Sequence, residues 1–132
     1  MSKYTDRAMM LREETPRPNC AETMLATFAD EIGLPADQLR SCGKHFGHGM
    51  KSGRTCGAIT GALMVLGALG VNDATIALDL QKLFRETHDG QINCAELMQG
   101  NAERGGNRKA FCDSLICSCI DFIEARAGDK LN

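Results

Sequence analysis

The chain has 132 residues, a formal net charge of −2 at pH 7 and seven cysteines. This length predicts one helical domain with a buried core over residues 1–132, beginning with a polar segment over residues 1–17. Both signs of charge occur along the chain, and no polybasic run indicates binding to nucleic acid or to an anionic membrane. The first residues lack the apolar run of a secretory signal, so we expect a cytoplasmic protein.

The spacing of apolar residues predicts an all-α protein, a compact single-domain helical bundle of about five or six helices. A capping box of Asn19 and Glu22 predicts the start of one helix, and Gly33 is a suitable residue to end it. The last helix is expected over residues 108–126, with an apolar face that begins at Cys112. No stretch alternates apolar and polar residues for long enough to predict a strand.

A Gly- and Ala-rich stretch, residues 53–71, is almost uncharged and predicts a buried central helix. It is too short and too rich in glycine for a membrane span, which needs roughly 20 apolar residues. Thr55 is a good N-cap residue, so Cys56 is expected at the first helical position. Gly57 and Gly61 lie about one turn apart and leave a face almost without side chains. We expect this face to contact either another helix or a cofactor.

Three cysteines each directly follow a residue that can cap a helix. These are Cys20, Cys56 and Cys94, which come after Asn19, Thr55 and Asn93. Free N–H groups and the helix dipole favour a thiolate at this position. The effect is roughly 0.3–1 kcal/mol, whereas one pKa unit corresponds to about 1.36 kcal/mol. A helix end alone therefore leaves a thiol mostly protonated at neutral pH, and a bound metal, or cations such as Lys44, Lys51 and Arg54, is needed as well.

Cys112 is the candidate fourth ligand, because it lies near the start of the last helix. Four thiolates suit Zn²⁺ or an iron–sulfur cluster. The four cysteines are far apart in sequence and include no C-x-x-C pair, so their spacing is also consistent with ordinary buried side chains. Of the other thiols, Cys119 is expected in the core, Cys117 on a more exposed face, and Cys42 in a glycine-rich loop whose two histidines are solvated.

Several segments together resemble one protein family. They are NCAE at 19–22, FGHGM at 46–50, TCGAITGA at 55–62, CAEL at 94–97 and the cysteine near the start of the last helix. The pattern resembles the redox-active C_GCAxxG_C_C family over residues 19–125. By this resemblance the family's cysteines fall on Cys20, Cys56, Cys94 and Cys112, and a similarity to the iron–sulfur portion of split-Soret cytochromes implies that they hold a cluster. The chain departs from the family name by reading C-G-A-x-x-G at 56–61 and by its three additional thiols.

We therefore expect a small redox protein that binds an iron–sulfur cluster through these four cysteines, for electron transfer or redox sensing. Gly57 and Gly61 would admit the cluster, the partner would be another redox protein, and any self-association would most simply be a homodimer. Two alternatives use the same cysteines: a thiol–disulfide oxidoreductase in which Cys20 cycles with Cys56 or Cys94, and a helical module stabilised by zinc. A helical scaffold with buried cysteines is the simplest alternative.

Overall fold

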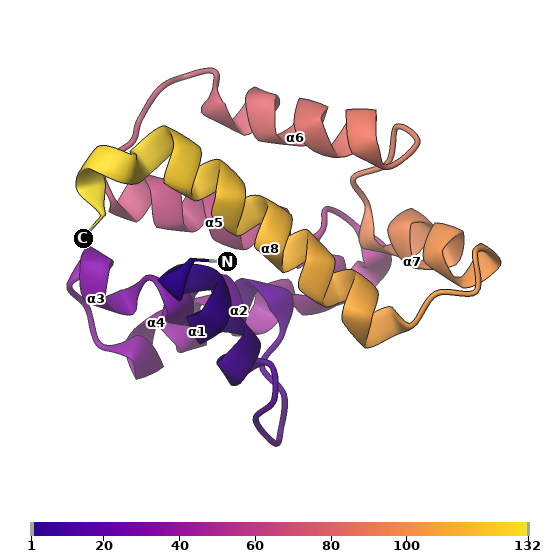
Figure 1. Ribbon diagram of the computed structural model, residues 1–132, viewed down its shortest axis with the longest axis horizontal. Coiled ribbons are helices and arrows are strands. Elements are labelled where there is room, and N and C mark those ends of the chain that lie inside the picture. The colour runs from indigo at the N-terminus through magenta and orange to yellow at the C-terminus, as the bar shows by residue number, and fades with distance from the viewer. Residues whose placement is uncertain (1, 132) are drawn as a thin grey trace.

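The computed structural model describes residues 2–131, which form eight α-helices joined by short turns. The helices are α1 (Lys3–Leu11), α2 (Cys20–Thr27), α3 (Ala29–Ile32), α4 (Ala36–Gly43), α5 (Gly57–Ala68), α6 (Ile76–Thr87), α7 (Cys94–Glu103) and α8 (Arg108–Ala127) (Figure 1). The all-α prediction is confirmed, since the described part of the chain has no strand beyond one isolated β-bridge. No helix within residues 2–131 is both long and apolar enough to cross a membrane.

The expected number of helices is slightly too low. The segment 19–33, expected as one helix, breaks at Phe28, whose backbone angles (φ −105°, ψ 16°) interrupt the helix between α2 and α3. Gly33 ends α3 in the left-handed conformation (φ 85°), as expected of a C-cap glycine. Part of the expected glycine-rich loop is helical, because α4 extends to Gly43 and a 3₁₀ turn follows over Lys44–Phe46.

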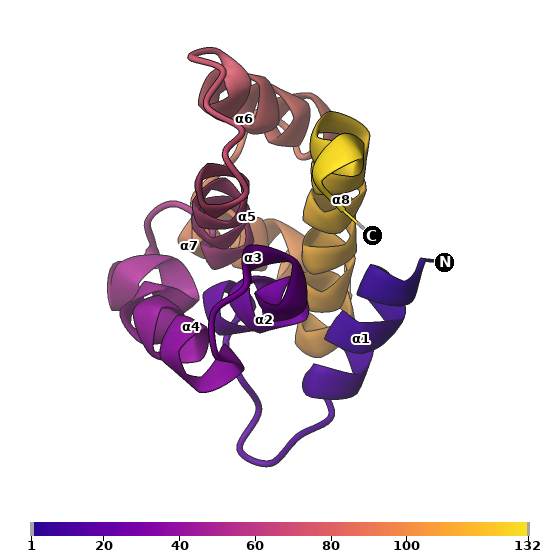
Figure 2. The same ribbon diagram turned by 90° about the vertical axis from the view of Figure 1, so that its left-hand side faces the viewer.

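The Gly- and Ala-rich helix α5 is central and packs against three helices, α2, α6 and α8 (Figures 1 and 2). The side chains that it buries are small or aliphatic: Ala58, Ile59, Ala62, Val65 and Leu66. Helix α8 contributes a long apolar face to the same core, made of Leu115, Ile116, Cys119, Ile120 and Ile123. This arrangement confirms the prediction of a buried central helix.

Helices α2 and α5 approach each other closely where α5 has glycine. A Cβ atom on Gly61 would lie 2.9 Å from the Met24 Cβ and 3.0 Å from the Ala21 Cα. A Cβ atom on Gly57 would lie 2.9 Å from the Phe46 carbonyl oxygen. At Gly61, therefore, the face without side chains contacts another helix.

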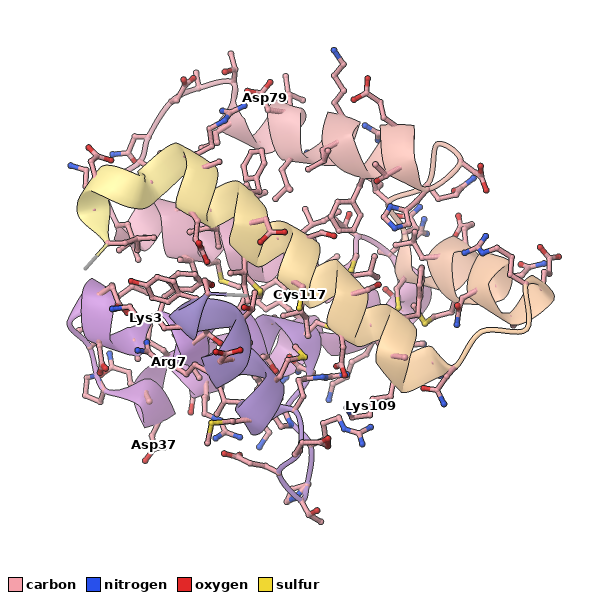
Figure 3. The ribbon with its side chains drawn as sticks, viewed as in Figure 1. Lys3, Arg7, Asp37, Asp79, Lys109 and Cys117 are labelled. Carbon is pink, nitrogen blue, oxygen red and sulfur yellow. The ribbon has the colours of Figure 1, made fainter. Side chains whose placement is uncertain are left out.

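The N-terminal polar segment contains a helix, α1, that packs against α2 and α8. Ser2 caps it by accepting a hydrogen bond from the Thr5 N–H at 3.2 Å. Tyr4 is buried and stacks on Phe28, with ring centroids 4.8 Å apart. Figure 3 shows Lys3 and Arg7 of this helix, both of which lie over the Tyr4 ring. Because α1 packs in this way, Arg12 comes next to the cysteines.

Candidate functional site: a four-cysteine cavity

Two of the four candidate cysteines are the first residue of a helix, as the sequence predicts. Cys20 begins α2, and the capping box is formed: the Asn19 Oδ1 accepts from the Glu22 N–H at 2.8 Å, and the Glu22 Oε1 accepts from the Asn19 N–H at 2.9 Å. Cys94 begins α7, although the side chain of Asn93 does not cap that helix. Cys112 lies farther along its helix, in the second turn of α8.

The predicted start of α5 is wrong by one residue. Cys56 itself is the N-cap, and Thr55 instead pairs with Asn93 in the isolated β-bridge. The Cys56 N–H donates to the Ile92 carbonyl at 2.9 Å, and the Cys94 N–H donates to the Arg54 carbonyl at 2.6 Å. This backbone pairing places the starts of α5 and α7 side by side.

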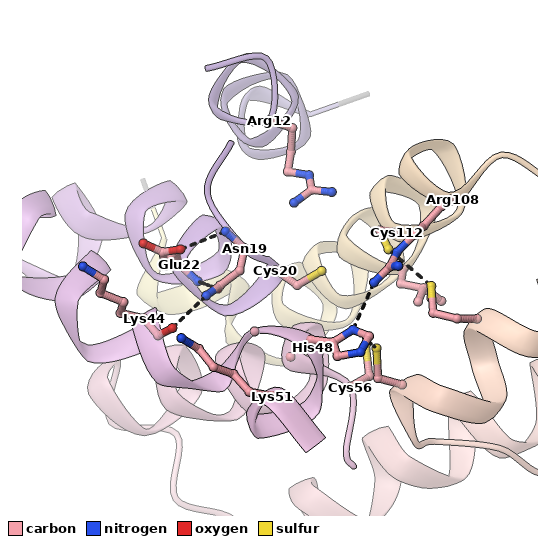
Figure 4. A pocket seen from close by; sticks show the side chains of 15 residues that line it. Arg12, Asn19, Cys20, Glu22, Lys44, His48, Lys51, Cys56, Arg108 and Cys112 are labelled. Atoms are coloured by element: carbon pink, nitrogen blue, oxygen red, sulfur yellow. Dashed lines mark hydrogen bonds between the residues drawn. The ribbon is translucent and has the colours of Figure 1, made fainter. Parts of the chain in front are cut away.

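All four cysteines line one cavity of about 440 Å³ (Figure 4). Its walls come from α2, α5, α7 and α8, with the end of α1 and the turns after α4 at its edge. Gly57 lines the cavity together with Met98 and Leu115. Gly61 does not, because the contact between α2 and α5 encloses it. The charged side chains at the cavity are Arg12, Glu22, Lys44, Lys51 and Arg108.

Their surroundings raise the pKa of three of the four thiols. Burial raises the pKa of Cys56 to about 12, although the N–H groups of Ala58 and Ile59, which face the sulfur without forming full capping hydrogen bonds, partly oppose this. Burial also raises the pKa of Cys94. The pKa of Cys20 is raised well above its usual value, first by its hydrogen bond to Cys112 and then by burial.

Cys112 is the exception, with a pKa lowered to about 6. The main cause is the hydrogen bond that the Cys20 thiol donates to it, and the guanidinium groups of Arg12 and Arg108 add to the effect. Arg12 is held in place by hydrogen bonds to the Asp113 Oδ1 at 2.8 Å and to the Pro18 carbonyl at 2.7 Å. The surroundings therefore distinguish Cys112, whose pKa is lowered, from Cys20, Cys56 and Cys94, whose pKa values are raised.

The cations that act on the thiols are not the ones suggested by the sequence. Lys44 and Lys51 line the cavity, and Arg54 does not, but none of the three changes the pKa of a cysteine. Arg12 and Arg108 do so instead. The sequence carries no signal for Arg12, because its place beside Cys112 depends on the packing of α1 against α8, a contact between segments distant in the chain.

His48 touches the site although its side chain is exposed, as expected of a loop histidine. Its Nδ1 lies 3.6 Å from the Cys94 sulfur and 3.0 Å from an Arg108 nitrogen. Arginine can only donate, so Nδ1 accepts this hydrogen bond. On the other wall, the Cys112 thiol lies 3.9 Å from the Met98 sulfur.

An iron–sulfur cluster and a single zinc ion would require different spacings of the four sulfur atoms. Zn–S bonds of about 2.3 Å would bring all four sulfur atoms within about 4.6 Å of one another. Within residues 2–131, no three Cys, His, Asp or Glu side chains converge closely enough to hold one metal ion. A cluster spreads its cysteine ligands over several metal atoms, which suits four thiols around a cavity of this volume.

The other three thiols lie outside the cavity. Cys119 is fully buried in the core, and Cys117 is half-buried on α8 (Figure 3), both as expected. Cys42 is exposed, in the last turn of α4 and not in a loop.

The fold and the site define a small all-helical protein in which the starts of several helices bring four cysteines to one cavity. A family model described as "Putative redox-active protein (C_GCAxxG_C_C)" matches residues 18–126, and the chain belongs to this family. No curated protein and no solved structure matches the chain. Family membership confirms the resemblance seen in the sequence and supports a redox role.

Proposed function

We propose that this protein carries electrons, for electron transfer or redox sensing, on an iron–sulfur cluster held by Cys20, Cys56, Cys94 and Cys112. The observation that carries the proposal is that four thiols from four helices line a single cavity. When bound, such a cluster supplies a one-electron carrier whose potential depends on charge, hydrogen bonds and solvent exposure around its sulfur atoms.

The surrounding residues are suited to thiolate ligands. Arg12 and Arg108 supply positive charge next to the sulfurs, and the N–H groups at the start of α5 face Cys56. Three thiols must lose their protons when the cluster binds, so cluster binding should strengthen as the pH rises.

The test is a set of single Cys→Ser variants purified without oxygen. Cys56→Ser should lose most of its iron and acid-labile sulfide, because the N-cap position places this sulfur in the wall of the cavity. Cys117→Ser is the matched control, since that thiol lies outside the cavity, and it should keep the wild-type content. Full iron and sulfide content in Cys56→Ser would refute the ligand assignment.

A second candidate, thiol–disulfide exchange, is favoured by the presence of Cys20 and Cys112 in one cavity, where their interaction raises the pKa of Cys20 and lowers the pKa of Cys112. The sequence had paired Cys20 with Cys56 or Cys94. In this reaction the Cys112 thiolate attacks a disulfide of a partner protein and releases one partner thiolate. The Cys20 thiol gives its proton to the released thiolate. The Cys20 sulfur then attacks the Cys112 sulfur, releases the second partner thiolate and leaves a disulfide between Cys20 and Cys112. A reversible loss of two thiols per chain, absent in Cys112→Ser, would identify this function, and zinc without sulfide would identify a zinc-stabilised module.

A further inference from the structure

One segment of the chain carries only positive charge, and two of its lysines line the cavity. Residues 38–72 contain no Asp or Glu but four basic residues, whereas the whole chain has a net charge of −2. The basic residues are Arg40, Lys44, Lys51 and Arg54. Charge is therefore distributed unevenly, with the rest of the chain more acidic than the total suggests.

Within residues 2–131, one of these four cations forms an ion pair and the other three do not. Arg40 pairs with the Glu14 carboxylate at 3.1 Å. Lys44, Lys51 and Arg54 are exposed, and they form no salt bridge with any residue that the structure describes. Unpaired cations on one segment of the surface create a local positive potential.

Lys44 and Lys51 do not serve the thiols. Both line the cavity, but the cysteine pKa values respond to Arg12 and Arg108 and not to the lysines. Figure 4 shows the two lysine ammonium groups turned away from the labelled cysteines. Their charge is thus available to an approaching molecule.

The backbone between the two lysines is strained. His48, Gly49, Met50 and Lys51 all have φ between 55° and 60°, a run of left-handed residues of which only one is glycine. Such conformations are unfavourable for L-residues and persist mainly where function requires them. The turn exposes the Met50 side chain, of which 52% is accessible. An exposed apolar side chain surrounded by charge is typical of a protein interface.

We propose that Lys44, Met50, Lys51 and Arg54, which we call the basic rim, form the docking surface for an acidic face of the partner redox protein. That the partner is a redox protein rests on the proposed function. A protein is favoured over a small anion because Lys44, Lys51 and Arg54 are all exposed, and Met50, next to Lys51 in the chain, adds an exposed apolar side chain. Redox encounters use small interfaces, and charge complementarity accelerates them.

The binding test uses fluorescein-labelled poly-L-glutamate as an acidic surface, measured by anisotropy at low and high NaCl. The double variant Lys44→Gln/Lys51→Gln should bind about threefold to tenfold more weakly than wild type at low salt, and wild-type affinity should fall as salt rises. The matched control is Lys82→Gln/Lys130→Gln, which removes the same charge from exposed lysines outside the cavity and should bind like wild type.

Three results would overturn the proposal: no binding by wild type, an equal loss in both double variants, or displacement of the polymer by inorganic phosphate at equal charge concentration. The last would indicate a small-anion site. The assay needs no cluster and is run on samples with and without iron, so it remains interpretable if the cluster proposal fails.

Discussion

The close contact between α2 and α5 should make Gly61 intolerant of a side chain. A Cβ atom there would lie 2.9 Å from the Met24 Cβ and 3.0 Å from the Ala21 Cα, and the second of these is backbone that cannot rotate away. Overpacking costs about 1–3 kcal/mol, whereas replacing Gly by Ala inside a helix gains about 0.5–1 kcal/mol. Gly61→Ala should therefore lower the free energy of unfolding by up to about 2.5 kcal/mol. Because Ala21 adjoins Cys20, the variant should also retain less iron.

The same helix offers a matched control at Gly67, where an added Cβ would meet nothing within 4 Å. Gly67→Ala should raise the free energy of unfolding by about 0.5–1 kcal/mol through helix propensity alone. Urea unfolding followed by far-UV circular dichroism, on reduced samples of equal metal content, measures both variants. The difference between Gly61→Ala and Gly67→Ala isolates the packing cost, about 1–3 kcal/mol. Equal stabilisation by both substitutions would refute the close helix contact.

Three further predictions concern the thiols and their surroundings. In metal-free reduced protein, the rate of alkylation of Cys112 by iodoacetamide should rise with a midpoint at about pH 6, because only the thiolate reacts. A midpoint near pH 9 for this rate would contradict the assigned environment. Arg12→Gln should raise that midpoint and lower the free energy of unfolding by about 1–3 kcal/mol, since it removes the buried hydrogen bond to Asp113 and leaves that carboxylate with Lys109 alone. Arg126→Gln, which removes an exposed ion pair, should cost less than about 1 kcal/mol in the same urea assay. Cys119→Ala should keep the full iron content while losing about 1–2 kcal/mol of stability to a core cavity, and loss of iron from this variant would place Cys119 in the site.

Local signals in the sequence predict the parts of the site that depend on neighbouring residues. The capping box joins Asn19 and Glu22, which are three residues apart, so the sequence alone can indicate it. It correctly predicts that Cys20 is at the start of a helix. The repeated NCAE segment does the same for Cys94. The glycine spacing of the central helix correctly indicates a close approach, but it cannot distinguish a helix from a cofactor.

Contacts between distant residues account for what the sequence does not predict. The pairing of Thr55 with Asn93 removes Thr55 from the capping position, and it joins segments that no local pattern relates. Arg12 reaches Asp113 across 101 positions of the chain. The break at Phe28 separates α2 from α3 although the apolar spacing continues through it. In each case tertiary packing decides between local options that the sequence leaves open.

The measurement that tests the central claim most directly is an absorption spectrum of protein purified without oxygen, with iron and acid-labile sulfide assayed on the same sample. A cluster on Cys20, Cys56, Cys94 and Cys112 predicts a brown protein with matched amounts of iron and sulfide. A colourless protein that also fails to take up iron and sulfide on reconstitution would contradict the proposal. Zinc in the absence of sulfide would contradict it as well.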